Sequence, residues 1–278
     1  IVALGAMRSG NVSRYTRYFC KPSLRIAGRT FHNWNRSEYG SYNVQQALMR
    51  SSNTWFFQAA LSAKGDPLIQ TAKEFGLGEK PVLPLDGVTA GAVPDKIIAQ
   101  RRLANFSIGQ GDLLVSPLQM AMVMSGIANG GYIPKPRLLL QFQTPPPSED
   151  VVRITPVLRP TVLDFSERDL NAVRQGMFDV VENERGTGKS AAAGWPRVAG
   201  KTGTAQWTSE SKKRNVAWFS GYVEGNHPRI AFAVMCEGRP GEQIFGGRVC
   251  APMAGTFIRT VYKNPKYYRV TVPGNRPK

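Results

Sequence analysis

The heptapeptide Gly200-Lys201-Thr202-Gly203-Thr204-Ala205-Gln206 lies inside a β-rich run that extends over Arg197–Trp207. Two more β-rich runs follow it, Asn215–Val223 and Arg229–Glu237. The segment Glu224-Gly225-Asn226-His227-Pro228 between the last two is a natural chain reversal. We therefore predict that the three runs form an antiparallel meander.

The first of these strands carries the residue types of a carboxylate receptor. Lys201 supplies a positive charge, and Thr202 and Thr204 supply hydroxyl groups for hydrogen bonds. Gly203 has no side chain, so a second backbone can approach closely and an extended peptide can add to this edge as an extra strand. The alternative is a solvent-facing strand end with an incidental lysine.

A second candidate site lies between two helical segments earlier in the chain. Within residues 41–64, Val44, Ala47 and Leu48 fall on one helical face before Ser51-Ser52-Asn53 interrupts it, and an apolar helix then extends to about Gly65-Asp66-Pro67. Ser51 and Asn53 can point into one cleft, where the first relays a proton and the second hydrogen-bonds a substrate amide. The alternative is that Ser52 or Asn53 simply caps the second helix.

Three further helices have recognisable starts or buried faces. One begins with the capping box Ser116-Pro117-Leu118-Gln119 and stops at Asn129-Gly130-Gly131. Another opens at Ser166 with Asp169 as its capping partner, and the last spans about Val249–Tyr262. The residues expected to face the core in the last two helices are Leu170, Val173, Met177, Val181, Ala254, Phe257, Ile258 and Val261.

Loops and connectors separate these elements. Residues 76–98 are rich in Gly and Pro and predict a loop, and Asn105–Gly111 uses glycines for tight turns. Residues 132–163 form a proline-rich connector between short extended pieces. Helices, then three consecutive strands, then a helix that packs back on them predict an α+β fold.

Several other classes of function lack support in the sequence. Gly186-Thr187-Gly188-Lys189-Ser190 resembles the end of a phosphate-binding loop, but Asn183 occupies the first glycine position and a helical segment precedes it. There are two histidines and no Gly-x-Ser-x-Gly elbow, which argues against a Ser-His-Asp triad. No zinc-finger spacing or RNA-binding aromatic signature supports nucleic acid.

The three cysteines, Cys20, Cys236 and Cys250, show no metal-binding spacing. They leave open one disulfide with a free thiol, or three buried thiols. We expect no metal and no cofactor.

The 278 residues are 42% hydrophobic and carry a formal net charge of +17, most of it near the two ends. Residues 1–50 hold eight Lys/Arg against Glu38 alone, and residues 241–278 hold seven against Glu242 alone. We interpret this charge as a solvated basic surface, with binding to anionic lipid or wall polymer as the alternative. No segment reaches the roughly 18 unbroken apolar residues of a membrane-spanning helix.

Taken in order, these motifs resemble the transpeptidase domain of class B penicillin-binding proteins, which has a Ser-x-x-Lys, a Ser-x-Asn and a Lys-Thr/Ser-Gly on a strand. Ser51-Ser52-Asn53 matches the second motif, and Lys201-Thr202-Gly203-Thr204-Ala205-Gln206 the third. Residues 107–131 and Gly186-Thr187-Gly188 are similar to the family's connecting segments, so the likeness extends from residue 1 to about 264. The resemblance implies an antiparallel sheet flanked by helices plus an all-helical subdomain, the β-lactamase-like fold.

The resemblance also implies acyl transfer in two steps. A serine attacks the penultimate D-Ala carbonyl of a peptidoglycan stem peptide ending in D-Ala-D-Ala, and an amine from a neighbouring strand then takes the acyl group. Ser51 would relay a proton to the leaving amine, and Asn53 would orient the substrate amide. Lys201 and Thr202 would hold the terminal carboxylate, and the backbone N–H of Thr204 would form half of the oxyanion hole.

One departure from the family pattern concerns the nucleophile, because no Ser-x-x-Lys stands ahead of Ser51. The segment Ile1-Val2-Ala3-Leu4-Gly5-Ala6-Met7 resembles the helix that follows that motif's lysine. We therefore expect the nucleophilic serine and its lysine just before Ile1, together with the first sheet strands and a membrane anchor. The present chain alone is then expected to be inactive.

As domains, we expect residues 1–264 to form one transpeptidase domain lacking its N-terminal part, with 265–278 as a basic C-terminal tail. Within it, residues 1–135 are mainly helical, and residues 136–264 hold the sheet and the C-terminal helices.

The implied location is the periplasmic face of the bacterial inner membrane. The implied partners are stem peptides, β-lactams, cell-wall synthesis proteins and, through the anchor, the membrane. The alternatives are a D,D-carboxypeptidase or β-lactamase of the same fold, or a non-catalytic β-lactam sensor or scaffold.

Overall fold

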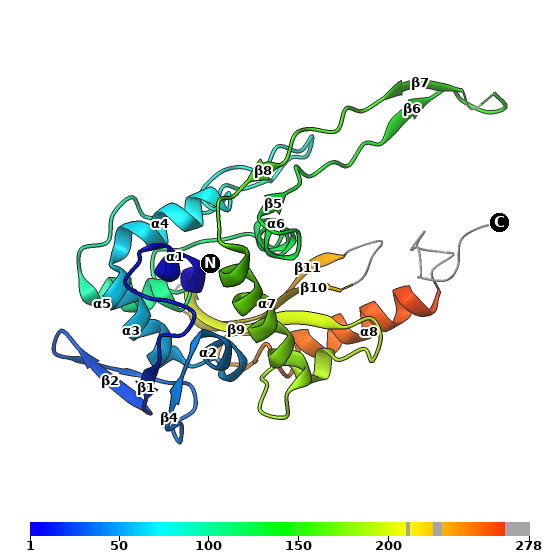
Figure 1. Cartoon of the computed structure of the whole chain (residues 1–278). Coiled ribbons are helices and arrows are strands. Elements are labelled where there is room, and N and C mark those ends of the chain that lie inside the picture. The colour runs from blue at the N-terminus through cyan, green and yellow to red at the C-terminus, as the bar shows by residue number, and fades with distance from the viewer. Residues whose placement is uncertain (149, 210–211, 225–229, 265–278) are drawn as a thin grey trace.

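The structure is a computed structural model that describes residues 1–148, 150–209, 212–224 and 230–264 (Figure 1). The helices are α1 (Val2–Arg8), α2 (Val44–Arg50), α3 (Asn53–Ala63), α4 (Gly65–Glu74), α5 (Gln100–Ser107), α6 (Pro117–Ala128), α7 (Glu167–Glu182), the 3-10 turn η1 (Lys189–Ala191) and α8 (Cys250–Lys263). The strands are β1 (Tyr18–Cys20), β2 (Ser23–Ile26), β3 (Arg29–His32), β4 (Gly40–Tyr42), β5 (Tyr132–Ile133), β6 (Gln141–Gln143), β7 (Val151–Ile154), β8 (Thr161–Val162), β9 (Val198–Ser209), β10 (Lys212–Val223) and β11 (Ala231–Glu237).

The predicted meander is confirmed as an antiparallel sheet in the order β11-β10-β9. The first two strands are longer than predicted, because β9 continues to Ser209 and β10 already begins at Lys212. The predicted reversal at 224–228 lies largely outside the described residues, as does the predicted tail at 265–278. The architecture is α+β, as the order of elements predicted.

The two faces of the sheet pack against different hydrophobic cores. Val198 and Phe219 belong to the smaller core, which α8 and the end of α7 complete. Ala199 and Tyr222 point to the opposite face and join the larger core of the helical region. Since side chains alternate along a strand, Lys201 shares the face of Ala199 and is directed toward the helices.

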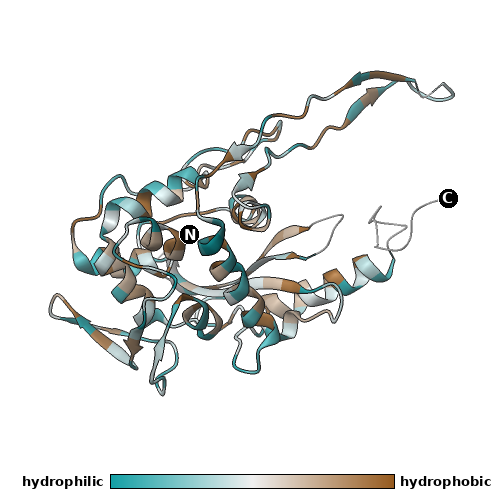
Figure 2. Ribbon diagram, viewed as in Figure 1, coloured by the Kyte–Doolittle hydropathy of each residue, from teal (hydrophilic) through white to brown (hydrophobic). Residues whose placement is uncertain are grey.

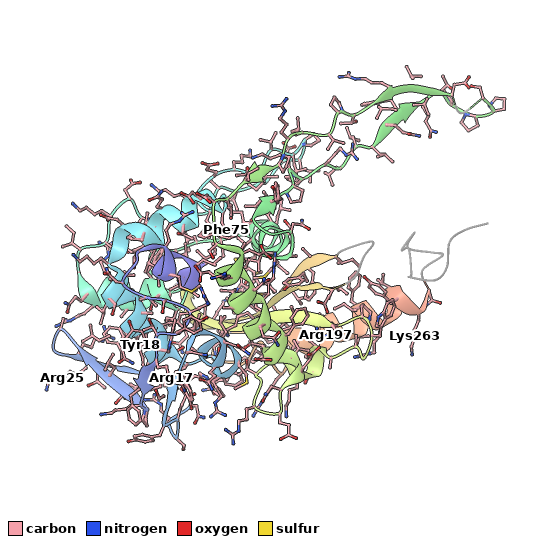
Figure 3. All side chains as sticks on the ribbon, viewed as in Figure 1. Arg17, Tyr18, Arg25, Phe75, Arg197 and Lys263 are labelled. Carbon is pink, nitrogen blue, oxygen red and sulfur yellow. The ribbon has the colours of Figure 1, made fainter. Side chains whose placement is uncertain are left out.

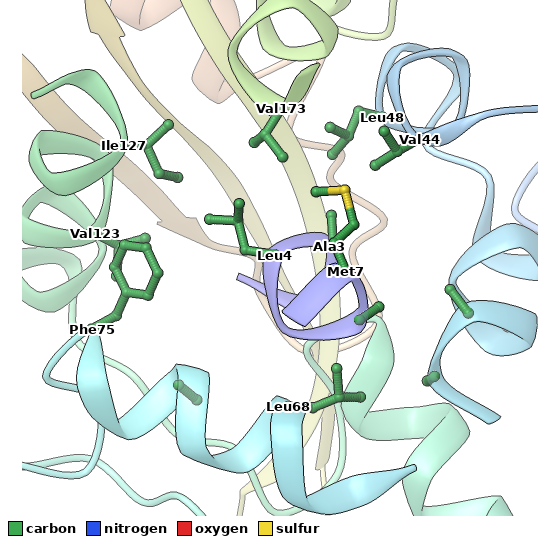
Figure 4. Packing of buried hydrophobic residues seen from close by; sticks show 14 of the residues in the cluster. Ala3, Leu4, Met7, Val44, Leu48, Leu68, Phe75, Val123, Ile127 and Val173 are labelled. Carbon is green, nitrogen blue, oxygen red and sulfur yellow. The ribbon is translucent and has the colours of Figure 1, made fainter. Parts of the chain in front are cut away.

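Helix α1 lies at the centre of the larger core, surrounded by α2, α4, α6 and α7 (Figure 4). Leu4 and Ala6 are fully buried, and a Cβ on Gly5 would come within 3.1 Å of Leu68. The small residues of this helix therefore let its neighbours pack closely around it.

Two of the helix predictions are confirmed in detail. Ser116 and Gln119 form the predicted capping box of α6, with Pro117 in its first turn. Residues 44–50 form α2 with a buried face, and the chain breaks at Ser51 as predicted.

Two details of the predictions are wrong. Ser166 takes the N-cap position of α7, but its side chain makes no capping bond, and Asp169 instead accepts a hydrogen bond from Arg14 at 3.5 Å. Phe257 was expected to face the core, but it is 50% exposed because α8 turns it away from the sheet.

The sequence did not reveal several short elements. They are the β1–β4 strand pair, the β2–β3 hairpin, and helices α4 and α5. Short strands of three or four residues give too little alternation to be recognised.

Residues 134–160 form an arm that extends away from the body of the molecule (Figure 1). Its base is the β5–β8 pair, and its outer part is the β6–β7 hairpin. Figure 2 shows hydrophobic stretches along the arm. Leu140, Phe142 and Ile154 belong to it and are exposed. Among the described residues, no helix has the length and apolar character needed to cross a membrane.

Candidate active site

Ser51 sits at the break between α2 and α3 in a left-handed conformation, with φ 57° and ψ 40°. The backbone N–H groups of Ser51 and Ser52 donate to the carbonyls of Leu48 and Ala47 and close the end of α2. Ser52 takes the N-cap position of α3, but its side chain is buried and makes no capping bond. Ser52 therefore starts the helix, as the capping alternative expected, but without a side-chain capping bond, and Asn53 is the first residue inside the helix.

Hydrogen bonds among neighbouring polar side chains stabilise the break between α2 and α3. The Glu38 carboxylate accepts a hydrogen bond from the Asn33 side-chain amide and faces the Arg50 guanidinium at 3.4 Å. The Asn33 side-chain oxygen accepts a hydrogen bond from the Asn53 backbone N–H at 2.8 Å. Sequence reasoning missed this role, although Glu38 stands out as the only acid among residues 1–50.

Lys201 meets Ser51 from the other side of the cleft. Its Nζ donates a hydrogen bond to the Ser51 Oγ and another to the Thr202 carbonyl at 2.8 Å. Burial of the ammonium lowers the pKa of Lys201 to about 8, because the charged form loses hydration. The two predicted motifs, 150 residues apart in sequence, are thus in direct contact.

Hydrogen bonds from two neighbouring segments hold Thr202 and Thr204 of β9 in place. The Thr202 hydroxyl lies 2.8 Å from the Thr187 hydroxyl, and the Thr204 hydroxyl accepts from the Gly246 backbone N–H at 3.4 Å. A Cβ on Gly246 would lie only 2.1 Å from the Trp218 carbonyl oxygen and 2.5 Å from the Gly203 carbonyl oxygen. Only glycine at position 246 lets this loop lie so close to the sheet.

All six predicted site residues line one open cavity of about 1160 Å³. They are Ser51, Asn53, Lys201, Thr202, Gly203 and Thr204. Trp34 and Phe245, which the sequence analysis did not single out, also line it. The indole N–H of Trp34 donates to the Arg50 carbonyl at 3.0 Å, which holds this ring beside the Ser51 break.

The predicted site residues contribute a cation, three hydroxyl groups and an amide to the lining of this cavity. Such a set can bind a carboxylate and an amide and can exchange a proton between Lys201 and Ser51. Among the described residues, no group of three or more His, Cys, Asp and Glu side chains could hold a metal ion.

Comparisons with known proteins all point to one family. The sequence model of a family described as "Penicillin binding protein transpeptidase domain" matches residues 1–259. The chain is 30% identical to the peptidoglycan D,D-transpeptidase MrdA of Haemophilus influenzae over 81% of its own length and 37% of that protein. It is 27% identical to stage V sporulation protein D of Bacillus subtilis over 87% of its own length and 38% of that protein.

A solved structure of Pseudomonas aeruginosa PBP2 in complex with WCK 5153 superposes with a TM-score of 0.75 at 27% identity. The match covers 94% of this chain and 58% of that one. The chain therefore spans about two fifths of the length of the two curated relatives and over half of the PBP2 chain in the crystal.

Proposed function

The chain belongs to the penicillin-binding protein transpeptidase family, and we propose that it is the greater part of the domain that crosslinks peptidoglycan stem peptides. The observation that carries this proposal is the hydrogen bond from the Lys201 ammonium to the Ser51 hydroxyl inside the shared cavity. The proposed reaction is transfer of a stem-peptide acyl group from a serine ester to an amine, with β-lactams as acylating mimics of D-Ala-D-Ala.

Ser51 and Lys201 are proposed as the proton relay of this reaction. When the acyl bond to the serine forms, the departing D-Ala amine needs a proton. The Ser51 hydroxyl can give its proton to that amine and take one from Lys201, to which it is hydrogen-bonded. A pKa near 8 supports this role, because proton exchange is most effective when the pKa of the group lies near the working pH.

The β9 residues are proposed to bind the substrate. Lys201 and Thr202 hold the terminal carboxylate, and the Thr204 N–H donates to the oxyanion that develops on the reacting carbonyl. Because β9 is an edge strand of the described sheet, the peptide can lie along it past Gly203. Asn53, on the opposite wall, orients the substrate amide.

We further propose that the nucleophilic serine and its lysine belong to the full-length product of the gene, in a segment that precedes Ile1. In this proposal residues 1–264 are the part of one transpeptidase domain that follows its N-terminal segment, the domain acts at the periplasmic face of the inner membrane, and cell-wall synthesis proteins are its partners. Its support is the order of the matched motifs and the family match from residue 1.

Intact-mass spectrometry after incubation with benzylpenicillin tests the proposal. The samples are this chain and the full-length product of its gene, each with and without boiling before the antibiotic is added. We expect a one-to-one adduct on the native full-length product alone, because a serine ester requires the assembled cleft. An adduct on the 278-residue chain would place the nucleophile within it and contradict that part of the proposal.

The same assay separates the competing functions when a stem peptide and an amine acceptor are added. A crosslinked product supports the transpeptidase, whereas hydrolysed stem peptide alone supports a carboxypeptidase. Rapid release of opened antibiotic supports a β-lactamase. A stable adduct without peptide turnover supports a sensor, and no adduct on either sample overturns the catalytic proposal.

A further inference from the structure

Basic side chains outnumber acidic ones in the lining of the cavity. The cations are Lys201, Arg185, Lys189 and Arg248, and Glu184 is the only acidic side chain among the lining residues. Among the described residues, none of these four cations forms an ion pair. The cleft therefore offers more positive charge than its own carboxylates neutralise.

Two of these cations lie on segments that meet beside Thr202. The loop containing Gly247 rests on the turn containing Thr187, since a Cβ on Gly247 would come within 2.3 Å of the Thr187 carbonyl oxygen and 3.7 Å of Thr202 Cγ2. Thr187 is in turn hydrogen-bonded to Thr202. Arg185 precedes Thr187 by two residues and Arg248 follows Gly247 directly, so both arginines lie on the segments that meet beside Thr202, and both line the cavity.

Both segments are held by backbone hydrogen bonds. The Arg185 N–H donates to the Asn183 side-chain oxygen at 2.9 Å, and the Gly188 N–H donates to the Val180 carbonyl at 2.9 Å. The Arg248 N–H donates to the Phe245 carbonyl at 3.0 Å. The arginine side chains themselves are exposed and can turn toward a bound anion.

We propose that Arg185 and Arg248 form the outer wall of the carboxylate receptor and select ligands that carry a free C-terminal carboxylate. This inference rests on the proposed function of Lys201 and Thr202. The ligand class is a peptide ending in a carboxylate, or a small molecule with the equivalent anion, rather than its uncharged amide. Guanidinium groups suit this role because they present paired N–H donors to a carboxylate.

The pair also differs from Lys201 in its response to pH. Lys201 loses its charge above about pH 8, whereas an arginine remains charged throughout the usable range. Any preference for a carboxylate that persists at high pH then comes from the arginines or from Lys189, and the double arginine substitution distinguishes the two. This difference makes the contribution of the pair measurable in the presence of Lys201.

The test measures the affinity of two diacetylated Lys-D-Ala-D-Ala tripeptides, one with a terminal carboxylate and one with a terminal carboxamide, by NMR titration of the full-length product. The variants are R185Q, R248Q and the double substitution. R25Q is the matched control, because Arg25 lies on β2 away from the cavity and points into solvent (Figure 3). Circular dichroism and thermal unfolding confirm that each variant is folded.

We expect each arginine substitution to lower the carboxylate-to-carboxamide affinity ratio about two- to fivefold, as for exposed ion pairs, and R25Q to leave it unchanged. At about pH 10 the parent should still prefer the carboxylate, and the double variant should not. R248K should restore only part of the loss, because an ammonium lacks the paired donors.

An unchanged ratio in the double variant would overturn the inference while leaving the proposed function intact. A parent protein that fails to prefer the carboxylate even at neutral pH would instead overturn the receptor assigned to Lys201 and Thr202, and this inference with it. The benzylpenicillin adduct, which reports the nucleophile, remains an independent readout of the proposed function.

Discussion

Lys201 is the residue whose surroundings most affect the proposed chemistry. Its ammonium is partly buried and its hydrogen-bond partners are a hydroxyl and a carbonyl, so no anion offsets the loss of hydration. The resulting pKa of about 8 means that the side chain is mostly charged near neutral pH but still able to release a proton. The same group can therefore attract a carboxylate and pass a proton to Ser51.

This pKa predicts how carboxylate binding depends on pH. The pKa of Lys201 is lowered, so its positive charge is present below about pH 8 and is lost as the pH rises through that value. Affinity for the diacetylated tripeptide should be highest at low pH and fall above pH 8 toward the level that the arginines sustain. In Lys201→Met it should be weaker at neutral pH and nearly flat. NMR titrations from about pH 6 to about pH 10 measure both curves.

A bound carboxylate raises the pKa of Lys201, so the fall in affinity begins near the pKa of the free protein and ends near the higher pKa of the complex. Retention of the same fall in affinity by Lys201→Met would assign the titration to another group. Asn53→Ala serves as a comparison variant, because it alters the opposite wall of the cavity without removing the charge.

The residues of the candidate site were found from sequence to different extents. Lys201 and Ser51 were recognisable from local motifs, because their neighbours along the chain carry the pattern. Thr187 and Glu38 were not recognised as site residues, because they act through contacts with Thr202 and with Arg50 and Asn33 that only the folded chain makes. A lone acid among eight cations was the only sequence signal for Glu38.

Among the elements, the loop ahead of α8 shapes the cleft more than its sequence suggested. The sequence predicted that a second backbone would approach Gly203 and assigned that backbone to the substrate. In the structure the chain's own Gly246 makes one such approach, with its N–H bonded to Thr204. The helices and long strands followed from periodicity, but this contact between distant glycines left no periodic signal.

Gly246→Ala is expected to displace this loop. The added Cβ would meet the Trp218 carbonyl oxygen at 2.1 Å, a contact with backbone that cannot turn aside. We expect a loss of about 1–3 kcal/mol in the free energy of unfolding, as for other overpacked sites, and a weaker tripeptide affinity. Denaturant unfolding and NMR titration measure the two effects. Arg239→Gln, an exposed change in the same loop outside the cavity lining, should alter neither.

In the whole molecule, the cleft forms where the two cores meet. Ser51 follows a helix of the larger core, whereas β9 contributes one face to each core and carries Lys201 between them. The sequence established the order of helices, strands and motifs, and the α+β class followed from it. The contact between Ser51 and Lys201, which are 150 residues apart in sequence, could not be predicted from the sequence, because it depends on how α2, α7 and β9 pack together.

The arm stands apart from both cores, which allows it to be removed as a unit. Strands β6 and β7 pair with each other and pack on no other element of the described chain to a comparable degree. The base of the arm is held to the body of the molecule by buried Ile133 and Leu163 and by the β5–β8 pair, not by β6 or β7. Arg137 donates to the Thr155 carbonyl at 3.0 Å, so the two legs of the arm are close at this level.

Replacing residues 141–154 by an Asn-Gly turn is therefore expected to leave the fold intact. The Thr155 backbone N–H donates to the Leu140 carbonyl at 3.0 Å, so a two-residue turn suits a hairpin closed between these two residues. The free energy of unfolding should change by less than about 1 kcal/mol, because the deleted side chains bury little surface. Self-association should decrease, since four large exposed apolar residues are lost: Phe142, Val151, Val152 and Ile154.

Thermal unfolding and sedimentation velocity measure these two effects on the full-length product, and tripeptide affinity reports the cleft. The cleft should be unchanged, because no arm residue lines the cavity. A matched variant that keeps the arm but replaces Phe142 and Ile154 with Thr separates the loss of apolar surface from the loss of length. Unfolding of the shortened protein at a clearly lower temperature would contradict the separation of arm and core, because it would mean that the arm stabilises α6 or α7 through its base.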